Sequence, residues 1–256
     1  MEFMNKSSES FDKLRLDFIS TVSHELRTPL TSIRGFAETL IASRDKLSDE
    51  QQLKFLSIIR DQSNRLINLV ENMLSASSQA EAEEIYVLKP VSVKSALDKV
   101  LIILKQKYPR KDVRLNLGEN IPEILVDTEK FEQILLNIVE NACKYSFENS
   151  DIVISSSNYE EKMLSINVEN EGFTIADSDK LKIFEKFTRL DNPMTSKTQG
   201  SGMGLYLALK MAKKMNGCID VESKDERTVF KICFPVATHE NVARSKIVGY
   251  KEFNDD

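Results

Sequence analysis

Two histidines occur in the chain, and one of them, His24, is followed directly by Glu25 and, four positions on, by Thr28. A neutral imidazole is a good nucleophile near neutral pH, and a carboxylate that accepts its ring proton makes the other nitrogen more nucleophilic. Thr28 lies one turn further along the same face of a helix, where its hydroxyl could hold a water. This spacing indicates a nucleophilic histidine with a base beside it. The alternative is an ordinary surface histidine.

A long helix must position His24. Apolar residues recur at steps of three, four or seven between Phe11 and Leu40, which predicts one helical seam. Each helical residue turns by about 100°, so His24 lies roughly 200° from both seam residues Val22 and Leu26. We therefore expect the imidazole to face away from the core.

A second helix is expected after a short turn. Ser48 and Gln51 have the form of a capping box, and the apolar spacing resumes from Leu53 to Met73. The two helices should form an antiparallel hairpin. Because two helices cannot bury both sides of a narrow apolar stripe, we expect a homodimer in which two hairpins make a four-helix bundle. The alternative is that the hairpin packs on the rest of its own chain.

The second part of the chain begins after a small, polar and acidic segment, Ser75–Glu84, where we expect a linker. Strand-like and helix-like patterns then alternate, which predicts a mixed α/β layer domain. The expected strands are Ile85–Leu88, Val113–Leu117, Ile152–Ser156, Leu164–Val168, Cys218–Ser223 and Thr228–Pro235. The expected helices are Ser92–Lys107, Thr128–Tyr145 with Asp127 as its cap, Ser178–Phe184 and Gly202–Met215.

Two further motifs accompany this pattern. Asn137, Asn141 and Lys144 fall at positions i, i+4 and i+7, which places them on one face of the helix Thr128–Tyr145. The segment Gly200-Ser-Gly-Met-Gly-Leu205 opens the last expected helix, whose first amide groups and dipole favour phosphate oxygens.

Together these motifs resemble those of the sensor histidine kinases. Ser23-His-Glu-Leu-Arg-Thr-Pro-Leu30 looks like the phosphoacceptor motif, and the second part resembles the ATP-binding domain of that family, which is related to the GHKL ATPases. The resemblance implies that His24 accepts a phosphoryl group with the help of Glu25. It also implies an α helical hairpin, dimeric as a four-helix bundle, followed by an α/β two-layer sandwich of the GHKL or Bergerat type.

The same resemblance assigns the nucleotide-binding residues. Leu136–Ser146 is similar to the N box, so Asn141 is the expected Mg²⁺ ligand and Asn137 and Lys144 are expected at the phosphates. Phe184–Phe187 is similar to the F box of the family. Residues 191–199 are the expected lid over the nucleotide. The remaining expected nucleotide-binding residues of these motifs are Tyr145, Phe184, Phe187, Arg189, Gly200, Gly202, Gly204 and Leu205.

One motif departs from the family. The first glycine box reads Asp-x-Gly-x-Gly in the family, whereas this chain has Asn170, Gly172 and Thr174 at the three positions. Asn170 keeps an acceptor oxygen for the adenine amino group but loses the charge, which costs on the order of 1 kcal/mol. Thr174 restricts a backbone that glycine leaves free. We expect nucleotide binding to be weakened but not abolished.

Composition sets further bounds. The 256 residues carry 35 basic and 40 acidic side chains, a net charge of -5, which gives no electrostatic footprint for nucleic acid. The three cysteines show no metal-ligand or disulfide spacing. No apolar run approaches the roughly 18 residues that cross a bilayer. We expect no membrane segment and a cytoplasmic location, either as a soluble kinase or as the cytoplasmic portion of a membrane-bound sensor.

Three regions follow from these patterns: residues 1–80 for dimerisation and histidine phosphotransfer, residues 81–237 for catalysis and ATP binding, and a flexible tail at 238–256. The expected function is autophosphorylation of His24 from Mg²⁺-ATP, followed by transfer to an aspartate on the receiver domain of a response regulator. By resemblance, Glu25 and Thr28 imply dephosphorylation of that regulator as well. A kinase-impaired nucleotide-binding scaffold or phosphatase, and a GHKL-type ATPase, are the alternatives.

Overall fold

The computed structural model describes residues 23, 26–43, 46–77, 85–159, 162–190, 193, 201–238 and 240–242, with backbone only at 65, 68–69, 71–77 and 158–159. The chain divides into two compact units, Met1–Ala82 and Glu83–Asp256. Most of the expected tail at 238–256 lies outside the described residues. No described helix is both long and apolar enough to cross a membrane.

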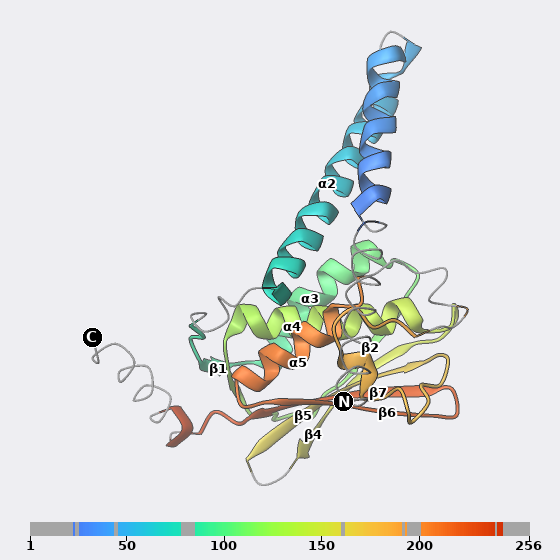
Figure 1. The fold of residues 1–256 in the computed structure, drawn as a ribbon. Coiled ribbons are helices and arrows are strands. Elements are labelled where there is room, and N and C mark those ends of the chain that lie inside the picture. Colours follow the sequence, from blue (N-terminus) through green and yellow to red (C-terminus); the bar gives the residue numbers. More distant parts are fainter. Residues whose placement is uncertain are drawn as a thin grey trace, which may run out of the picture. The chain divides into compact units, whose positions relative to one another are not determined.

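The first unit is a helical hairpin, as the sequence predicts. A helix over residues 26–43 and the helix α2 (Asp49–Ser77) run side by side in opposite directions (Figure 1). Between them, the rings of Phe36 and Phe55 have centroids 5.2 Å apart. The predicted capping box is confirmed, because the Ser48 amide donates to Gln51 Oε1 at 3.0 Å and the Gln51 amide donates to Ser48 Oγ at 3.3 Å.

The hairpin leaves apolar side chains exposed in this single chain. Six of its large aliphatic side chains are exposed: Leu30, Ile41, Leu53, Leu56, Ile67 and Val70. Solvent-exposed apolar residues at helical spacing on both helices are typical of a hairpin that packs against a further surface.

The second unit contains a five-stranded sheet in the order β2-β4-β5-β7-β6. Strand β2 pairs with β4 in parallel, and the other neighbours pair antiparallel. A separate two-stranded antiparallel ladder joins β1 to β3. The strand bounds are β1 Lys89–Val91, β2 Val113–Asn116, β3 Ile124–Val126, β4 Ile152–Tyr159, β5 Met163–Glu171, β6 Cys218–Lys224 and β7 Arg227–Pro235.

Three helices cover one face of this sheet (Figure 1): α3 (Val93–Lys107), α4 (Thr128–Tyr145) and α5 (Gly204–Lys214). The core lies between the two layers, where Phe131 of α4 meets Phe234 of β7 edge to face with centroids 5.5 Å apart. A short 3₁₀ helix, η3 (Lys182–Phe184), precedes α5. The predicted helical hairpin followed by an α/β layer domain is confirmed.

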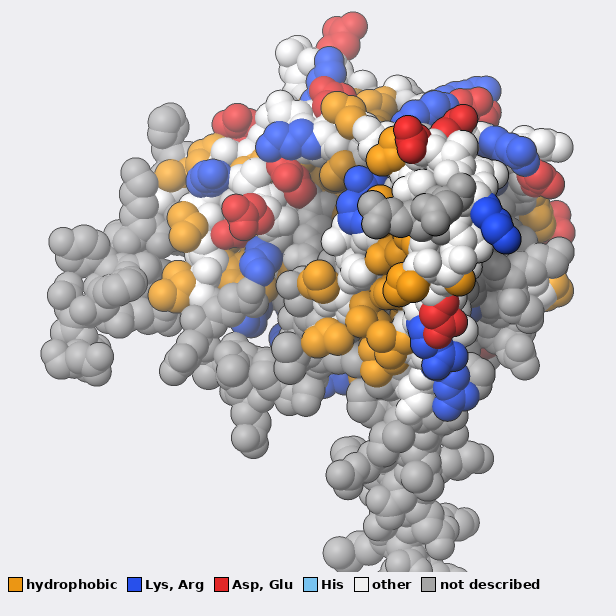
Figure 2. Space-filling view, turned by 90° about the horizontal axis from the view of Figure 1, so that it is seen from above, with side chains coloured by type: hydrophobic (Ala, Val, Ile, Leu, Met, Phe, Trp, Pro, Cys, Tyr) orange, Lys and Arg blue, Asp and Glu red, His pale blue; other side chains and the backbone are white. Residues whose placement is uncertain are grey.

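Charges of both signs are mixed among the described residues on one face of the molecule (Figure 2). On the face drawn in Figure 2, the described Lys and Arg side chains are interspersed with Asp and Glu. Two ion pairs of this kind tie α3 to α4, Lys99 to Glu132 at 2.7 Å and Lys107 to Glu140 at 2.6 Å. These pairs link the two helices at two places along their lengths.

The prediction of a strand at Ile85–Leu88 was wrong. Residues 85–88 form no regular element, and β1 begins only at Lys89. Ile85 and Val87 are exposed. The Val87 amide donates to Asp127 Oδ2 at 3.0 Å and not to a neighbouring strand. Strand β3 was missed because its three buried residues, Ile124–Val126, are too few to show a period.

Leu135→Ala tests how firmly α4 is anchored. Leu135 has no exposed surface, so its truncation should lower the free energy of unfolding by about 2–5 kcal/mol. Leu115→Ala is the control, because Leu115 of the edge strand β2 stays 38% exposed and should lose less than half as much. Urea unfolding followed by circular dichroism measures both. Equal losses would contradict the packing described for α4.

Candidate nucleotide-binding site

The helix α4 presents the polar residues of the expected N box. Asp127 caps the helix, because its Oδ1 accepts hydrogen bonds from the amides of Glu129 at 3.1 Å and Lys130 at 3.2 Å. The opposite face of the helix is buried through Phe131, Ile134, Leu135, Ile138, Val139 and Ala142. This burial leaves Asn137 and Asn141 half-buried, one turn apart on the same face.

The start of α5 lies beside this polar face. A Cβ atom added to Gly204 would lie 3.5 Å from Asn137 Oδ1, which places the first residue of α5 next to the Asn137 amide. The N-cap residue of α5, Met203, makes no side-chain hydrogen bond to the helix. The first amide groups of α5 therefore have no side-chain cap and can donate to an anion placed near Asn137.

The second glycine box also packs against the F box. Gly202 has a φ angle of +69°, and a Cβ atom there would lie 2.7 Å from the carbonyl carbon of Phe187 and 2.8 Å from the carbonyl oxygen of Thr188. Phe187 itself has a φ angle of 65°. The two motifs thus approach backbone to backbone, which requires glycine at position 202. The F-box ring of Phe184 is held against Phe230 of β7, with centroids 6.4 Å apart.

Asn170 belongs to a buried polar row that crosses three strands. It lies opposite Thr228 in the pairing of β5 with β7, and Thr228 lies opposite Ser223 in the pairing of β7 with β6. All three side chains are buried. Ser223 Oγ and Thr228 Oγ1 share a hydrogen bond of 2.8 Å, and the Ile175 amide donates to Ser223 Oγ at 2.9 Å. The row is uncharged and can both donate and accept hydrogen bonds.

Sequence reasoning missed Ser223 and Thr228. A signal was present, because both residues continue the alternating buried positions of their strands, where apolar residues are expected. A polar side chain at a buried position needs a hydrogen-bond partner, so it marks either an internal network or a ligand site.

The first glycine box joins this row to the end of α4. A Cβ atom at Gly172 would lie 2.3 Å from the carbonyl oxygen of Tyr145 and 3.2 Å from Asn170 Nδ2. Ser146 and Gly172 also form an isolated antiparallel bridge. No side chain larger than hydrogen fits at position 172 without moving the last turn of α4.

Thr174 stands at the position of the family's second glycine. Its Oγ1 accepts a hydrogen bond from the Glu226 amide at 2.9 Å, in the turn between β6 and β7. The threonine therefore ties the loop after β5 to that turn.

Lys144 contacts a carboxylate on its own helix. Its Nζ lies 2.9 Å from Glu140 Oε1, and both side chains are largely buried. Burial opposes the charged form of Glu140, but the charge of Lys144 and the hydrogen bonds from Lys107 and Lys144 lower its pKa from 4.5 to about 2. Glu140 is thus ionised at neutral pH.

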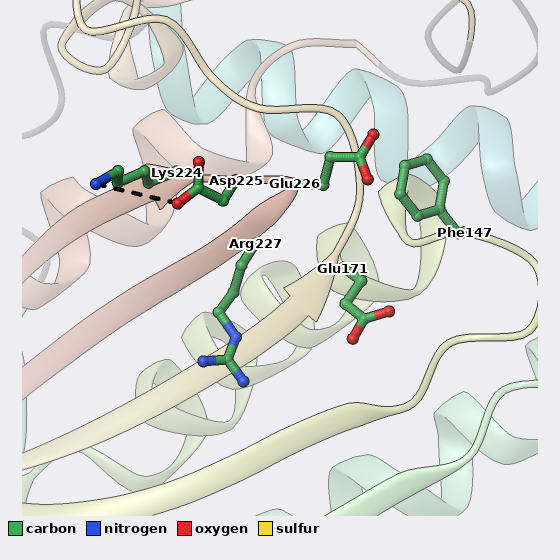
Figure 3. A pocket seen from close by; sticks show the side chains of 6 residues that line it. All are labelled: Phe147, Glu171, Lys224, Asp225, Glu226 and Arg227. Atoms are coloured by element: carbon green, nitrogen blue, oxygen red, sulfur yellow. Dashed lines mark ion pairs between the residues drawn. The ribbon is translucent and has the colours of Figure 1, made fainter.

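A separate hollow of about 630 Å³ lies at the turn between β6 and β7 (Figure 3). Its lining consists of Phe147, Glu171, Lys224, Asp225, Glu226 and Arg227. In Figure 3 the Glu171 and Arg227 side chains extend to the same side of the strands, while Lys224 pairs with Asp225. The hollow contains none of the N-box residues, so we place the candidate site at α4 and α5 instead.

Several expected site residues are not shown beside another site residue or lie outside the described part of the chain. Thr28 is exposed in the helix of the first unit, while His24, Glu25 and Gly200 lie outside the described residues. So does the expected lid at 191–199, apart from Pro193. Arg189 and Leu205 are half-buried. The structure brings together Asn137 with Gly204, Gly202 with Phe187, and Asn170 with Gly172 and Tyr145.

Comparison with protein families gives two matches in chain order. Residues 14–81 match the His Kinase A (phospho-acceptor) domain, and residues 126–238 match the histidine kinase-, DNA gyrase B- and HSP90-like ATPases. The chain belongs to the sensor histidine kinases of two-component systems.

Known sensor histidine kinases resemble the chain along most of its length. Sensor histidine kinase WalK of Bacillus subtilis (strain 168) is 32% identical over 226 residues, which cover 84% of this chain and 35% of WalK. The chain spans between about a third and a half of the length of the curated relatives it matches first.

Solved histidine kinase structures share the fold. Full-length ShkA in complex with AMPPNP has a TM-score of 0.63 and 26% identity, covering 86% of this chain and 45% of ShkA. The histidine kinase ThkA in complex with the response regulator protein TrrA has a TM-score of 0.61 and 23% identity, covering 93% of this chain and 67% of ThkA.

Two glycines of this histidine kinase allow a matched test. Gly202→Ala should lower the free energy of unfolding by about 1–3 kcal/mol, because alanine is strained at positive φ and its Cβ would meet the Phe187 backbone. Gly204→Ala should change it by less than about 1 kcal/mol, since the added Cβ makes ordinary contacts at a helix start. Urea unfolding compares the two variants. A larger loss for Gly204→Ala would contradict the described packing.

Glu140→Gln tests the electrostatics of α4. Because the folded pKa of Glu140 is lowered from 4.5 to about 2, its ionised form stabilises the fold above pH 4.5. This contribution is lost as the pH falls from 4.5 towards 2. Wild type should therefore exceed Glu140→Gln in unfolding free energy at neutral pH, with the difference shrinking in that window. A difference that is constant with pH would contradict the assignment.

Proposed function

We propose that this chain is a kinase core that binds Mg²⁺-ATP in its second unit and transfers the γ-phosphoryl group to His24. The observation that carries the proposal is the approach of Gly204 to Asn137, where an added Cβ atom would lie 3.5 Å from Asn137 Oδ1. It sets the Asn137 amide oxygen beside the N-terminus of α5, which has no side-chain cap. Such a pair of features suits a triphosphate and its cation.

The side chains present suit Mg²⁺. This ion prefers oxygen ligands and keeps several waters, so one or two protein oxygens suffice. Asn141 would hold it, with Asn137 and Lys144 at the phosphates, and the missing side chain at Gly204 leaves room beside Asn137. When bound, Mg²⁺ would neutralise charge on the phosphate oxygens.

At the other end of the site, Asn170 would accept a hydrogen bond from the adenine amino group. The buried row that it forms with Thr228 and Ser223 supports this role, because its groups are neutral and can form hydrogen bonds. Gly172 allows the close approach of α4 to this row.

The proposed transfer to His24 forms a nitrogen–phosphorus bond and breaks a phosphorus–oxygen bond of ATP. The His24 ring nitrogen attacks the γ-phosphorus, the bond to the β,γ-bridging oxygen breaks, and ADP leaves. Glu25 takes the proton from the other ring nitrogen. A carboxylate on the receiver domain of a response regulator then accepts the phosphoryl group and frees the histidine. Phosphoryl transfer depends mainly on positioning and charge, which is what these residues would supply.

We further propose a homodimer and a response-regulator partner. The exposed aliphatic side chains of the hairpin, such as Ile41 and Leu53, support pairing with a second hairpin. ThkA, which shares the fold, forms a complex with a response regulator. The exposure of Thr28 supports phosphatase activity on the regulator, because a partner can approach this residue.

A kinase-impaired nucleotide-binding scaffold or phosphatase is the second candidate. Asn170 and Thr174 favour it. A neutral amide in place of a carboxylate weakens one hydrogen bond to the base by on the order of 1 kcal/mol. Thr174 holds its loop to the Glu226 amide at 2.9 Å, where glycine would leave the loop free.

Incubation with γ-labelled Mg²⁺-ATP tests the kinase. The protein should acquire a label that is stable to alkali and labile to acid, as expected of phosphohistidine. His24→Ala should abolish the label, and His239→Ala, which changes the only other histidine, should retain it. An unlabelled wild type that still binds nucleotide would favour the scaffold or phosphatase, and Asn170→Asp would then show whether that residue is responsible.

A further inference from the structure

One carboxylate oxygen on α4 accepts three hydrogen bonds. Glu140 Oε1 receives Lys107 Nζ at 2.6 Å, Lys144 Nζ at 2.9 Å and the Tyr108 hydroxyl at 3.0 Å. Lys107 and Tyr108 come from the end of α3, whereas Lys144 is on α4 with Glu140. Lys144 belongs to the expected N box, so the cluster includes a residue of the proposed phosphate site.

Two of the three donors on Glu140 come from α3 and do not depend on Lys144. A buried carboxylate is costly unless it is paired and hydrogen-bonded. Lys107 supplies the opposite charge and Tyr108 a second hydrogen bond, so the carboxylate stays paired if Lys144 leaves. Burial and the neighbouring Glu140 raise the pKa of Tyr108, which keeps its hydroxyl a donor.

We propose that Glu140 and Lys107 are positioning residues that control when Lys144 can reach the triphosphate. Glu140 holds Lys144 on α4 while the site is empty, and Lys107 neutralises Glu140 when Lys144 turns to the phosphates. This inference rests on the proposed function. It adds a residue of α3, outside the nucleotide motifs, to the determinants of nucleotide affinity.

A second ion pair provides a matched control. Lys99 lies 2.7 Å from Glu132 and joins the same two helices eight positions earlier on each. Lys99 and Lys107 have similar exposed fractions, 63% and 57%. Lys99→Met therefore removes an equivalent helix-to-helix contact without touching Glu140.

The experiment measures Mg²⁺-ATP and AMP binding to the full chain by calorimetry. Without Lys107, Lys144 becomes the only cation on Glu140, so Lys107→Met should weaken Mg²⁺-ATP binding about tenfold. Lys99→Met should change it less than twofold. Adding Glu140→Gln to Lys107→Met should restore affinity to within about threefold. AMP, which lacks the β- and γ-phosphates, should bind all these variants alike.

A double-mutant cycle guards against misfolding of the Glu140 variants. Lys144→Met should weaken Mg²⁺-ATP binding, and Lys107→Met should add nothing to it. The inference is overturned if Lys99→Met matches Lys107→Met, if AMP loses the same affinity, or if the Lys107 and Lys144 effects add. If the wild type binds no Mg²⁺-ATP, the proposed function falls and this inference falls with it. If the wild type binds and Lys107→Met has no effect, only this inference falls.

Discussion

The packing of α4 on the sheet is the constraint on which the second unit depends. Its apolar face, from Phe131 to Ala142, is buried, and Phe131 meets Phe234 across the core. Because a helix has fixed angular spacing, burying one face dictates where Asn137 and Asn141 point. The hydrophobic core thus sets the direction of the polar side chains, and α5 and the glycine boxes are arranged around them.

Local signals predicted much of this arrangement. Asp127, as a cap, gave a helix start that agrees with α4, and the Ser48–Gln51 box gave the start of α2. Each of these signals acts within a few residues of the helix end that it marks. Backbone hydrogen bonding near a cap is decided locally, which is why the sequence alone sufficed.

Contacts between distant segments were not predictable in the same way. The two-stranded ladder of β3 with β1 was missed, and the strand expected at Ile85–Leu88 lacks a partner. The hydrogen bonds of Glu140 to Lys107 and Tyr108 join positions 33 and 32 residues apart, and no periodicity marks them. The motifs predicted candidate site residues, but the neighbours of those residues follow from tertiary packing.

Gly172 has a consequence for the whole site. The carbonyl oxygen of Tyr145 and the side-chain amide of Asn170 both lie against it, so Gly172 joins the end of α4 to the buried polar row. Asn141 is on the same rigid helix as Tyr145. A shift of the last turn of α4 would therefore press on Gly172 and its neighbour Asn170. Gly172 thus couples the position of the proposed phosphate-binding helix to that of the proposed base-binding residue.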